Sequence, residues 1–323
     1  MKNMTFEEFK NYIQEHIGEY LSEDFKDAKI RVSTIKKANG YEYEGMNISR
    51  ANDLDGGIIP VVNLTEAYAK YEKGAPLVGI MNDLANVRMN TPIPEGISRD
   101  SFTNFDSMRD RIFPRLISAK NQEDYLSSRP FHQVADLAVV YTVRVHTDEH
   151  GFAEAVVDNE LLRIWGVDEN TLHEAALANL EKQEPVFMNI EDAMFGKLDG
   201  TELPKFDPEG INMDNCPIPF FLLTNQQKVK GANMALCSKF MDRITEKFGS
   251  VYVLPSSTHE VLIVPKAFMD DPDKLAEMVR QVNEDAVQPE DRLSDNVYEY
   301  NPDTQSLEIA STDPIQDESV SMV

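Results

Sequence analysis

The 323-residue sequence has little of what marks a specialised structural class. Its two cysteines, Cys216 and Cys237, are far apart and have no CxxC spacing, which excludes a disulfide scaffold and favours a reducing compartment. No apolar run approaches the roughly 20 residues that span a bilayer. The first residues also lack the apolar core of a signal peptide. We therefore expect a cytoplasmic protein without a membrane partner.

Familiar cofactor motifs are missing as well. The sequence has no GxGxxG and no glycine-rich loop followed by Lys-Ser or Lys-Thr, so neither common nucleotide-binding loop is present. His259-Glu260 starts like a zinc-protease motif, but the residue four positions after the histidine is Ile263 and the segment is not helical. We predict no cofactor.

Positive charge is scarce. Lysine and arginine number 31 against 56 acidic residues, a net charge of −25, and residues 270–323 alone carry 3 basic and 15 acidic groups. Phosphate backbones and anionic lipids attract basic residues, so direct binding of nucleic acid or membrane is disfavoured. Three interpretations of the acidic surface stay open: plain solubility, a face for a basic protein partner, and a mimic of nucleic acid.

What the sequence does have is a mixture of helical and strand patterns. Thr5 and Glu8 form a capping box before a helix over residues 5–21, and Asn39-Gly40 is a hairpin signal between two strands. The N-terminal module, residues 1–95, is thus predicted as a helix, a three-stranded meander and two helices. Its strands are expected near residues 30–34, 41–48 and 58–62, the last at an edge because of Pro60, and its later helices at 64–71 and 77–87.

The turn-rich residues 90–101 separate this module from a larger mixed α/β region, residues 100–315. Residues 136–145 are apolar and β-branched throughout, which predicts a central strand buried on both faces. Asp168 is predicted to cap a helix, and a further helix is expected over residues 232–248. The long loop 196–219 is a candidate division of this region, and residues 316–323 form an acidic tail. The fold class that follows is α+β.

One candidate catalytic group lies around a turn before a strand. Ser256, Ser257, His259 and Glu260 have the residue types of a nucleophile, a base and a carboxylate. Neighbours at one strand end seldom reach the geometry of a triad. The alternative is a turn in which these side chains satisfy backbone groups.

A second candidate group surrounds the central strand. Arg115, Arg129, His132 and Asp136 could bind an anionic ligand, or they could form a structural ion-pair cluster. His146 and His150, at a predicted hairpin tip, are weak candidates for metal ligands. Exposed polar residues are expected at such a tip in any case.

Several motifs also resemble a family of proteins with a domain of unknown function, found largely in anaerobic gut bacteria. The resemblance spans nearly the full chain and rests on segments from the first helix to the last hairpin. They are Met4-Thr5-Phe6-Glu7-Glu8-Phe9, Arg129-Pro130-Phe131-His132, Leu161-Leu162-Arg163-Ile164-Trp165-Gly166, Leu254-Pro255-Ser256-Ser257-Thr258-His259-Glu260-Val261 and Leu293-Ser294-Asp295-Asn296-Val297-Tyr298. The resemblance implies a bacterial, cytoplasmic protein and assigns no activity or functional residue.

Three hypotheses on function follow. The first is a non-enzymatic binding or interaction protein with an acidic surface and a basic protein partner. The second is an enzyme or small-ligand binder in which His259 and Glu260 converge with Arg115, His132 and Asp136. The third is an acidic mimic of nucleic acid. The absence of a catalytic motif favours the first.

Overall fold

The computed structural model describes residues 4–50, 59–91, 97–148, 151–195 and 203–311. Contacts along the chain divide it into two compact units, Met1–Ser107 and Met108–Val323. Helices and antiparallel sheets occur in both units, which confirms the α+β class. The domain boundaries derived from the sequence stay a prediction. In the described part of the chain, no helix is long and apolar enough to cross a membrane.

Unit 1 is the helix, meander and helix pair expected from the sequence. Thr5 caps the first helix with the predicted capping box, and a 3₁₀ turn at Ile17–Tyr20 replaces the expected last helical turn. The strand order is β1-β2-β3, so β3 is an edge strand, as Pro60 indicated, and Ile58 lies outside the described residues. The elements are α1 (Phe6–His16), β1 (Lys29–Lys36), β2 (Glu42–Ser49), β3 (Val61–Asn63), α2 (Leu64–Glu72) and α3 (Leu77–Asn90).

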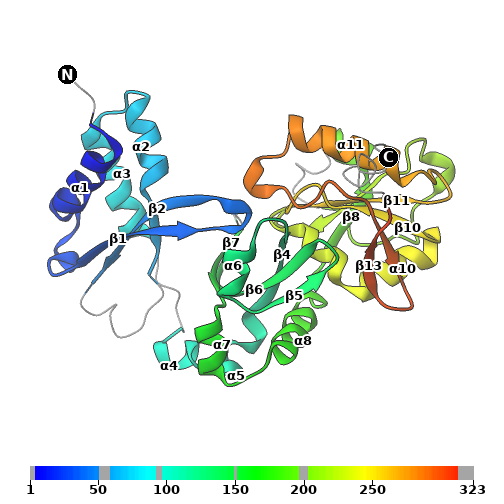
Figure 1. The fold of residues 1–323 in the computed structure, drawn as a ribbon, viewed down its shortest axis with the longest axis horizontal. Coiled ribbons are helices and arrows are strands. Elements are labelled where there is room, and N and C mark those ends of the chain that lie inside the picture. Colours follow the sequence, from blue (N-terminus) through cyan, green and yellow to red (C-terminus); the bar gives the residue numbers. More distant parts are fainter. Residues whose placement is uncertain (1–3, 51–58, 92–96, 149–150, 196–202, 312–323) are drawn as a thin grey trace, which may run out of the picture. The chain divides into compact units, whose positions relative to one another are not determined.

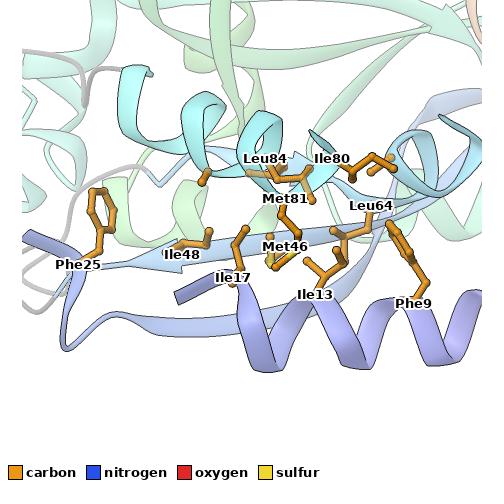
Figure 2. Packing of buried hydrophobic residues seen from close by; sticks show 13 residues of the cluster. Phe9, Ile13, Ile17, Phe25, Met46, Ile48, Leu64, Ile80, Met81 and Leu84 are labelled. Carbon is orange, nitrogen blue, oxygen red and sulfur yellow. The ribbon is translucent and has the colours of Figure 1, made fainter. Parts of the chain in front are cut away.

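The core of unit 1 forms where one sheet face meets the helices. Side chains at helical spacing on α1, alternate side chains of β2 and one side of α3 point toward one another (Figure 2). Phe9, Ile13 and Met46 are fully buried there. Burial of such large apolar side chains contributes about 1.5–3 kcal/mol each. The short helices α4 (Arg99–Phe102) and α5 (Phe105–Met108) follow this module in the chain.

The first sheet of unit 2 contains four antiparallel strands. Strand β6 pairs with β4 on one side and with β5 and β7 on the other, so it is central, as its sequence predicted. Residues 137–143 of this strand are buried. The helix α8 packs against one face of the sheet (Figure 1), and Asp168 caps it as expected, accepting from Thr171 N at 2.8 Å. The elements are β4 (Ile112–Ser118), α6 (Glu123–Ser127), β5 (Phe131–Val134), β6 (Leu137–Asp148), β7 (Gly151–Val156), α7 (Asn159–Trp165) and α8 (Glu169–Leu180).

The second sheet of unit 2 has six antiparallel strands in the order β13-β12-β10-β11-β9-β8. Its central strands are buried on both faces, because α11 covers one face and α10 lies against the other (Figure 1). Aromatic rings of β8, β9 and α10 pack against one another there. The elements are β8 (Pro185–Asn189), α9 (Ile190–Met194), β9 (Phe221–Asn225), α10 (Ser238–Phe248), β10 (Val251–Leu254), β11 (Val261–Pro265), α11 (Pro272–Asp285), β12 (Tyr298–Asn301) and β13 (Ser306–Ile309).

Two details differ from the sequence-based expectation. The single helix predicted over residues 232–248 is wrong: a 3₁₀ helix, η8 (Gly231–Leu236), is separated from α10 by Cys237, whose backbone is extended. The strands β5 and β8 were not predicted; β5 has only 4 residues, too few for an alternation pattern to be recognised. The described part of the 196–219 loop, residues 203–219, contains the 3₁₀ turn Met213–Asn215, and the predicted tail lies outside the described residues.

The 3₁₀ helix η8 is fixed to the first sheet of unit 2 by the side chain of Asn233. Asn233, in η8, occupies the free edge of β4 much as a paired strand would. Its side chain accepts from Leu116 N at 2.8 Å and donates to Pro114 O at 2.7 Å. Because both groups belong to the edge backbone of β4, this contact fixes η8 against the first sheet. Lys230, the residue just before η8, is thereby placed near the first sheet.

Candidate functional site

The candidate site lies on the face of the first sheet opposite α8. Antiparallel partners share a face, so the register pairs Phe113–Thr142, Arg115–Val140 and Arg144–Glu154 bring side chains of β4, β6 and β7 together. Arg115, Thr142, Arg144 and Glu154 are therefore polar neighbours on a sheet surface. Polar residues on a partly buried face need partners, which makes their contacts informative.

A cluster of cations occupies this face. We define the basic cluster as Arg115, Arg144 and Lys230, the last of which reaches in from the residue before η8. Lys230 Nζ lies 2.6 Å from Glu154 Oε2, and Arg144 Nη2 lies 3.9 Å from Glu154 Oε1. The side chains of Arg144, Lys230 and Glu154 are only 16%, 23% and 7% exposed. One carboxylate therefore serves two cations in a region with little water.

Arg115 has no such counter-charge within the described ranges. Among the residues that the structure describes, its guanidinium makes neither a hydrogen bond nor an ion pair, and its Nε is buried. Arg144 Nε and the hydroxyl of Thr142 are also buried without a hydrogen-bond partner in that part of the chain. Burial lowers the pKa of Lys230, opposed by Glu154, and the charges of Arg115 and Arg144 lower it further. The three cations therefore lie close enough to repel one another.

Aromatic rings hold Arg144 in place. The Cζ atom of Arg144 lies 3.7 Å from the ring centroid of Phe113 and 4.1 Å from that of Phe152. Such cation–π contacts are stabilising, and they leave the N–H groups at the edge of the guanidinium free to bind a ligand. Burial lowers the pKa of Arg144, opposed by Glu154. The arginine nonetheless keeps its charge, because its ordinary pKa is so high.

The backbone at Lys230 and Gly231 places the lysine. Lys230 has a left-handed backbone conformation (φ 54°), and its N–H donates to His259 Nδ1 at 3.4 Å. A Cβ atom on Gly231 would meet Thr224 Oγ1 and lie 2.5 Å from His259 O. Only glycine allows the chain to pass this close to the second sheet. The lysine of the basic cluster is thus anchored to the turn that contains His259.

The predicted catalytic group forms a hydrogen-bonded turn. His259 N donates to Ser257 Oγ at 3.0 Å, and His259 Nε2 lies 3.3 Å from Asp291 Oδ1. Both ring nitrogens of His259 therefore face a partner, one the Lys230 amide and the other a carboxylate. Burial raises the pKa of Glu260, whose carboxyl interacts with Ser257. Ser256 uses its carbonyl to accept from Leu293 N at 3.2 Å.

Asp136 makes a different contact. It lies in the β5–β6 turn and accepts hydrogen bonds from Ser294 Oγ at 2.9 Å, Asn296 Nδ2 at 3.1 Å and the hydroxyl of Tyr298. Burial and the Asp136 charge raise the pKa of Tyr298. These residues are more than 150 positions apart in the sequence. Asp136 therefore joins the first sheet to the second.

His132 lies on the α8 face of the sheet. It pairs with Val139, whereas Arg115 pairs with Val140, and consecutive residues of a strand point to opposite faces. Its ring stacks on His173 of α8, with centroids 4.4 Å apart, and Tyr141 Oη lies 2.9 Å from His173 Nδ1. Burial, with the nearby His132, lowers the pKa of His173 to about 4. His132 and Arg115 thus face opposite sides of the sheet.

The remaining candidates lie apart from the basic cluster. Arg129 covers the ring of Tyr125, with its Cζ 3.5 Å from the centroid, and donates to the carbonyl of that residue. His146 is exposed, while His150 lies outside the described residues. Within the described ranges, no three His, Cys, Asp or Glu side chains are grouped so as to hold a metal ion.

The predicted residues therefore do not meet in one place. Arg115 lies in the basic cluster, and His259 contacts that cluster because it accepts a hydrogen bond from the backbone of Lys230. The other three candidates each have different neighbours: His132, Asp136 and Arg129. Sequence reasoning missed Arg144, Lys230, Thr142 and Asp291. Strand alternation within residues 136–145 places Arg144 and Thr142 on one face, which was an available signal.

Comparison with known proteins gives one family. The model of DUF5688, a family of unknown function, matches residues 6–302. The chain belongs to DUF5688. Membership in DUF5688 confirms the resemblance to a family of unknown function and, like that resemblance, assigns no activity. No curated protein and no solved structure matches the chain.

Proposed function

We propose that this protein binds a small anionic ligand through the basic cluster of unit 2. The observation that carries the proposal is the charge imbalance: three half-buried cations share one carboxylate, and Arg115 has no partner among the described residues. Unpaired charges in such surroundings lower the stability of the folded state. Residues that are kept despite such a loss of stability are found mainly at functional sites. An anionic ligand would supply the missing counter-charge.

The chemistry of the cluster supports this interpretation. Arginine presents five N–H donors in a fork that matches carboxylate and phosphate oxygens. The donors of Arg115 and most of those of Arg144 are not used within the described protein, and the ammonium of Lys230 gives one hydrogen bond there, to Glu154. The buried hydroxyl of Thr142 adds a further donor on the same face.

The contacts of His259 favour binding over catalysis. Its Nδ1 accepts from the Lys230 backbone, and its Nε2 faces Asp291. A general base needs a ring nitrogen that is free to reach the substrate. Ser257 Oγ accepts from the backbone N–H of His259, and among the described residues its hydroxyl does not donate to the His259 ring, so the serine is not arranged as a nucleophile. The role that fits His259 is to hold the turn that positions Lys230.

Calorimetry on the full chain tests this proposal. Titrations with phosphate, sulfate and small carboxylates should show saturable binding by the native protein. Arg115→Gln should abolish it, whereas Arg163→Gln, which changes an exposed arginine of α7, should leave it unchanged. Ligand at 100 times its Kd should also raise the stability of unit 2 by about 2.7 kcal/mol. Equal binding by both variants would refute the site.

A basic protein partner is a separate proposal that one observation favours. Asp273, Glu277, Glu284 and Asp285 of α11 are exposed, so this helix presents carboxylates at the surface. A basic partner held by such charges should be released at 1 M salt, where screening acts over about 3 Å. A partner that is captured equally in low and high salt would contradict the electrostatic version.

A further inference from the structure

We infer that the anion bound by the basic cluster is a compact tetrahedral dianion of the phosphate monoester class. This inference rests on the proposed function and narrows it. Its basis is the net charge of the cluster: Arg115, Arg144 and Lys230 contribute three positive charges and Glu154 one negative charge. A monoanion would leave one positive charge uncompensated, whereas a dianion would neutralise the site.

The donors point to a ligand with several oxygens around one centre. Arg115 belongs to β4, Arg144 to β6 and Lys230 to the segment before η8, so three separate elements present N–H groups to the same region. A carboxylate has two oxygens, whereas a phosphate monoester offers three acceptor oxygens that can each receive a hydrogen bond. The larger acceptor set matches three cationic side chains better.

The orientation of Arg144 adds to this argument. Two phenyl rings lie against its guanidinium, with their centroids 3.7 and 4.1 Å from Cζ, which favours contact with a ligand through the edge of the group. Edge-on donors suit bidentate binding of phosphate oxygens. Glu154 holds Lys230 Nζ at 2.6 Å, which fixes the lysine beside the same edge. The side chains are therefore ordered before the ligand arrives.

The surroundings exclude long polyanions. The chain carries a net charge of −25, and the side chains of Arg144 and Lys230 are largely buried, while Arg115 is half-buried. A nucleic acid needs a broad exposed basic surface to release counter-ions, which a half-buried group of three residues does not provide. A single phosphate group would place no further charges against the acidic surface.

Methyl phosphate and methyl sulfate form a matched pair of probes for calorimetry. Both are tetrahedral and similar in size, but methyl sulfate is a monoanion at every pH used, whereas a phosphate monoester loses its second proton near a pKa of about 6. At pH 8 methyl phosphate should bind at least about tenfold more tightly than methyl sulfate. At pH 5, where about nine-tenths of the ester is a monoanion, its affinity should fall by roughly tenfold.

Methyl sulfate also reports any change in the protein itself, since its own charge is constant. A pH-dependent change in the protein would alter the binding of both probes, whereas titration of the ligand alters the binding of methyl phosphate alone. Arg115→Gln should abolish the binding of both probes, Lys230→Gln should remove the preference for methyl phosphate, and Arg163→Gln should retain that preference. The fluorescence of Trp165 verifies that unit 2 of each variant is folded.

The outcomes separate the two proposals. Equal affinity for the two probes at pH 8, with both lost in Arg115→Gln, would overturn the dianion and leave anion binding in place. No binding of either probe, or binding that Arg115→Gln does not change, would overturn the proposed function as well. A preference for methyl phosphate that disappears at pH 5 would support both.

Discussion

Replacing Glu154 by glutamine separates the structural role of the basic cluster from its binding role. Glu154 is the carboxylate that Lys230 and Arg144 share, at 2.6 and 3.9 Å. Glutamine keeps the shape and some hydrogen bonding but removes the charge. The cluster then changes from a net charge of two to three, while its three cations stay in place. Stability and anion affinity should therefore move in opposite directions.

The magnitude follows from the contacts. Loss of one partner of a buried ion pair costs about 3–5 kcal/mol. Because Lys230 and Arg144 keep some contact with water, we expect Glu154→Gln to lower the unfolding free energy of unit 2 by about 2 kcal/mol. For the ligand, a unit charge about 5 Å from a dianion contributes about 1.7 kcal/mol even at the dielectric constant of water. Affinity for methyl phosphate should thus rise by about tenfold at low salt.

Urea unfolding followed by Trp165 fluorescence measures the first effect, because the single tryptophan lies in α7 of unit 2 and is 8% exposed. Calorimetry with methyl phosphate measures the second. Glu174→Gln, an exposed glutamate on α8, is the matched control and should change neither quantity. An affinity for methyl phosphate that did not rise in Glu154→Gln would refute the argument that the net charge of the basic cluster sets anion affinity.

Three further substitutions test the surroundings of the site. Asp136→Ala leaves three donors without their acceptor and should destabilise unit 2 by about 3 kcal/mol in the Trp165 assay; a loss below about 1 kcal/mol would show that the contact is not structural. Gly231→Ala places a Cβ atom against neighbouring backbone and should displace Lys230, so methyl phosphate affinity should fall; unchanged affinity would refute the positioning role of the turn. His173 has a folded-state pKa of about 4, below the unfolded value of about 6.5, so the unfolded chain binds the proton first and stability should fall as the pH drops from about 6.5 to about 4. His173→Gln should flatten that fall, and an identical pH profile would contradict the assignment.

The elements that the sequence predicted well are those with a local physical cause. The capping box at Thr5 and the cap at Asp168 each depend on residues within three positions of one another. The central strand β6 was predictable because β-branched residues without alternation indicate burial on both faces. The prediction of one helix over residues 232–248 failed for a non-local reason. Asn233 binds the edge backbone of β4, so η8 is held against the first sheet, and the extended Cys237 separates it from α10.

The candidate site was harder to predict because it depends on register. Arg115 and His132 were expected to meet, yet pairing with consecutive residues of β6 puts them on opposite faces. A change of one residue in the pairing register moves every side chain of a strand to the opposite face of the sheet. Nothing local in either segment determines that register. Lys230 was not singled out, because its place in the cluster depends on the close approach of Gly231 to the second sheet.

The composition of the chain concealed the site in another way. A net charge of −25 argued against nucleic acid and anionic membranes, yet that argument concerns the long-range field and not a local contact. At physiological ionic strength, screening limits the field of exposed carboxylates to about 8 Å. The contacts within the basic cluster are shorter and largely shielded from water, so they are screened far less. Acidic surface and basic cluster therefore act at different ranges: the surface repels extended polyanions, while the cluster selects a small anion that fits between Arg115, Arg144 and Lys230.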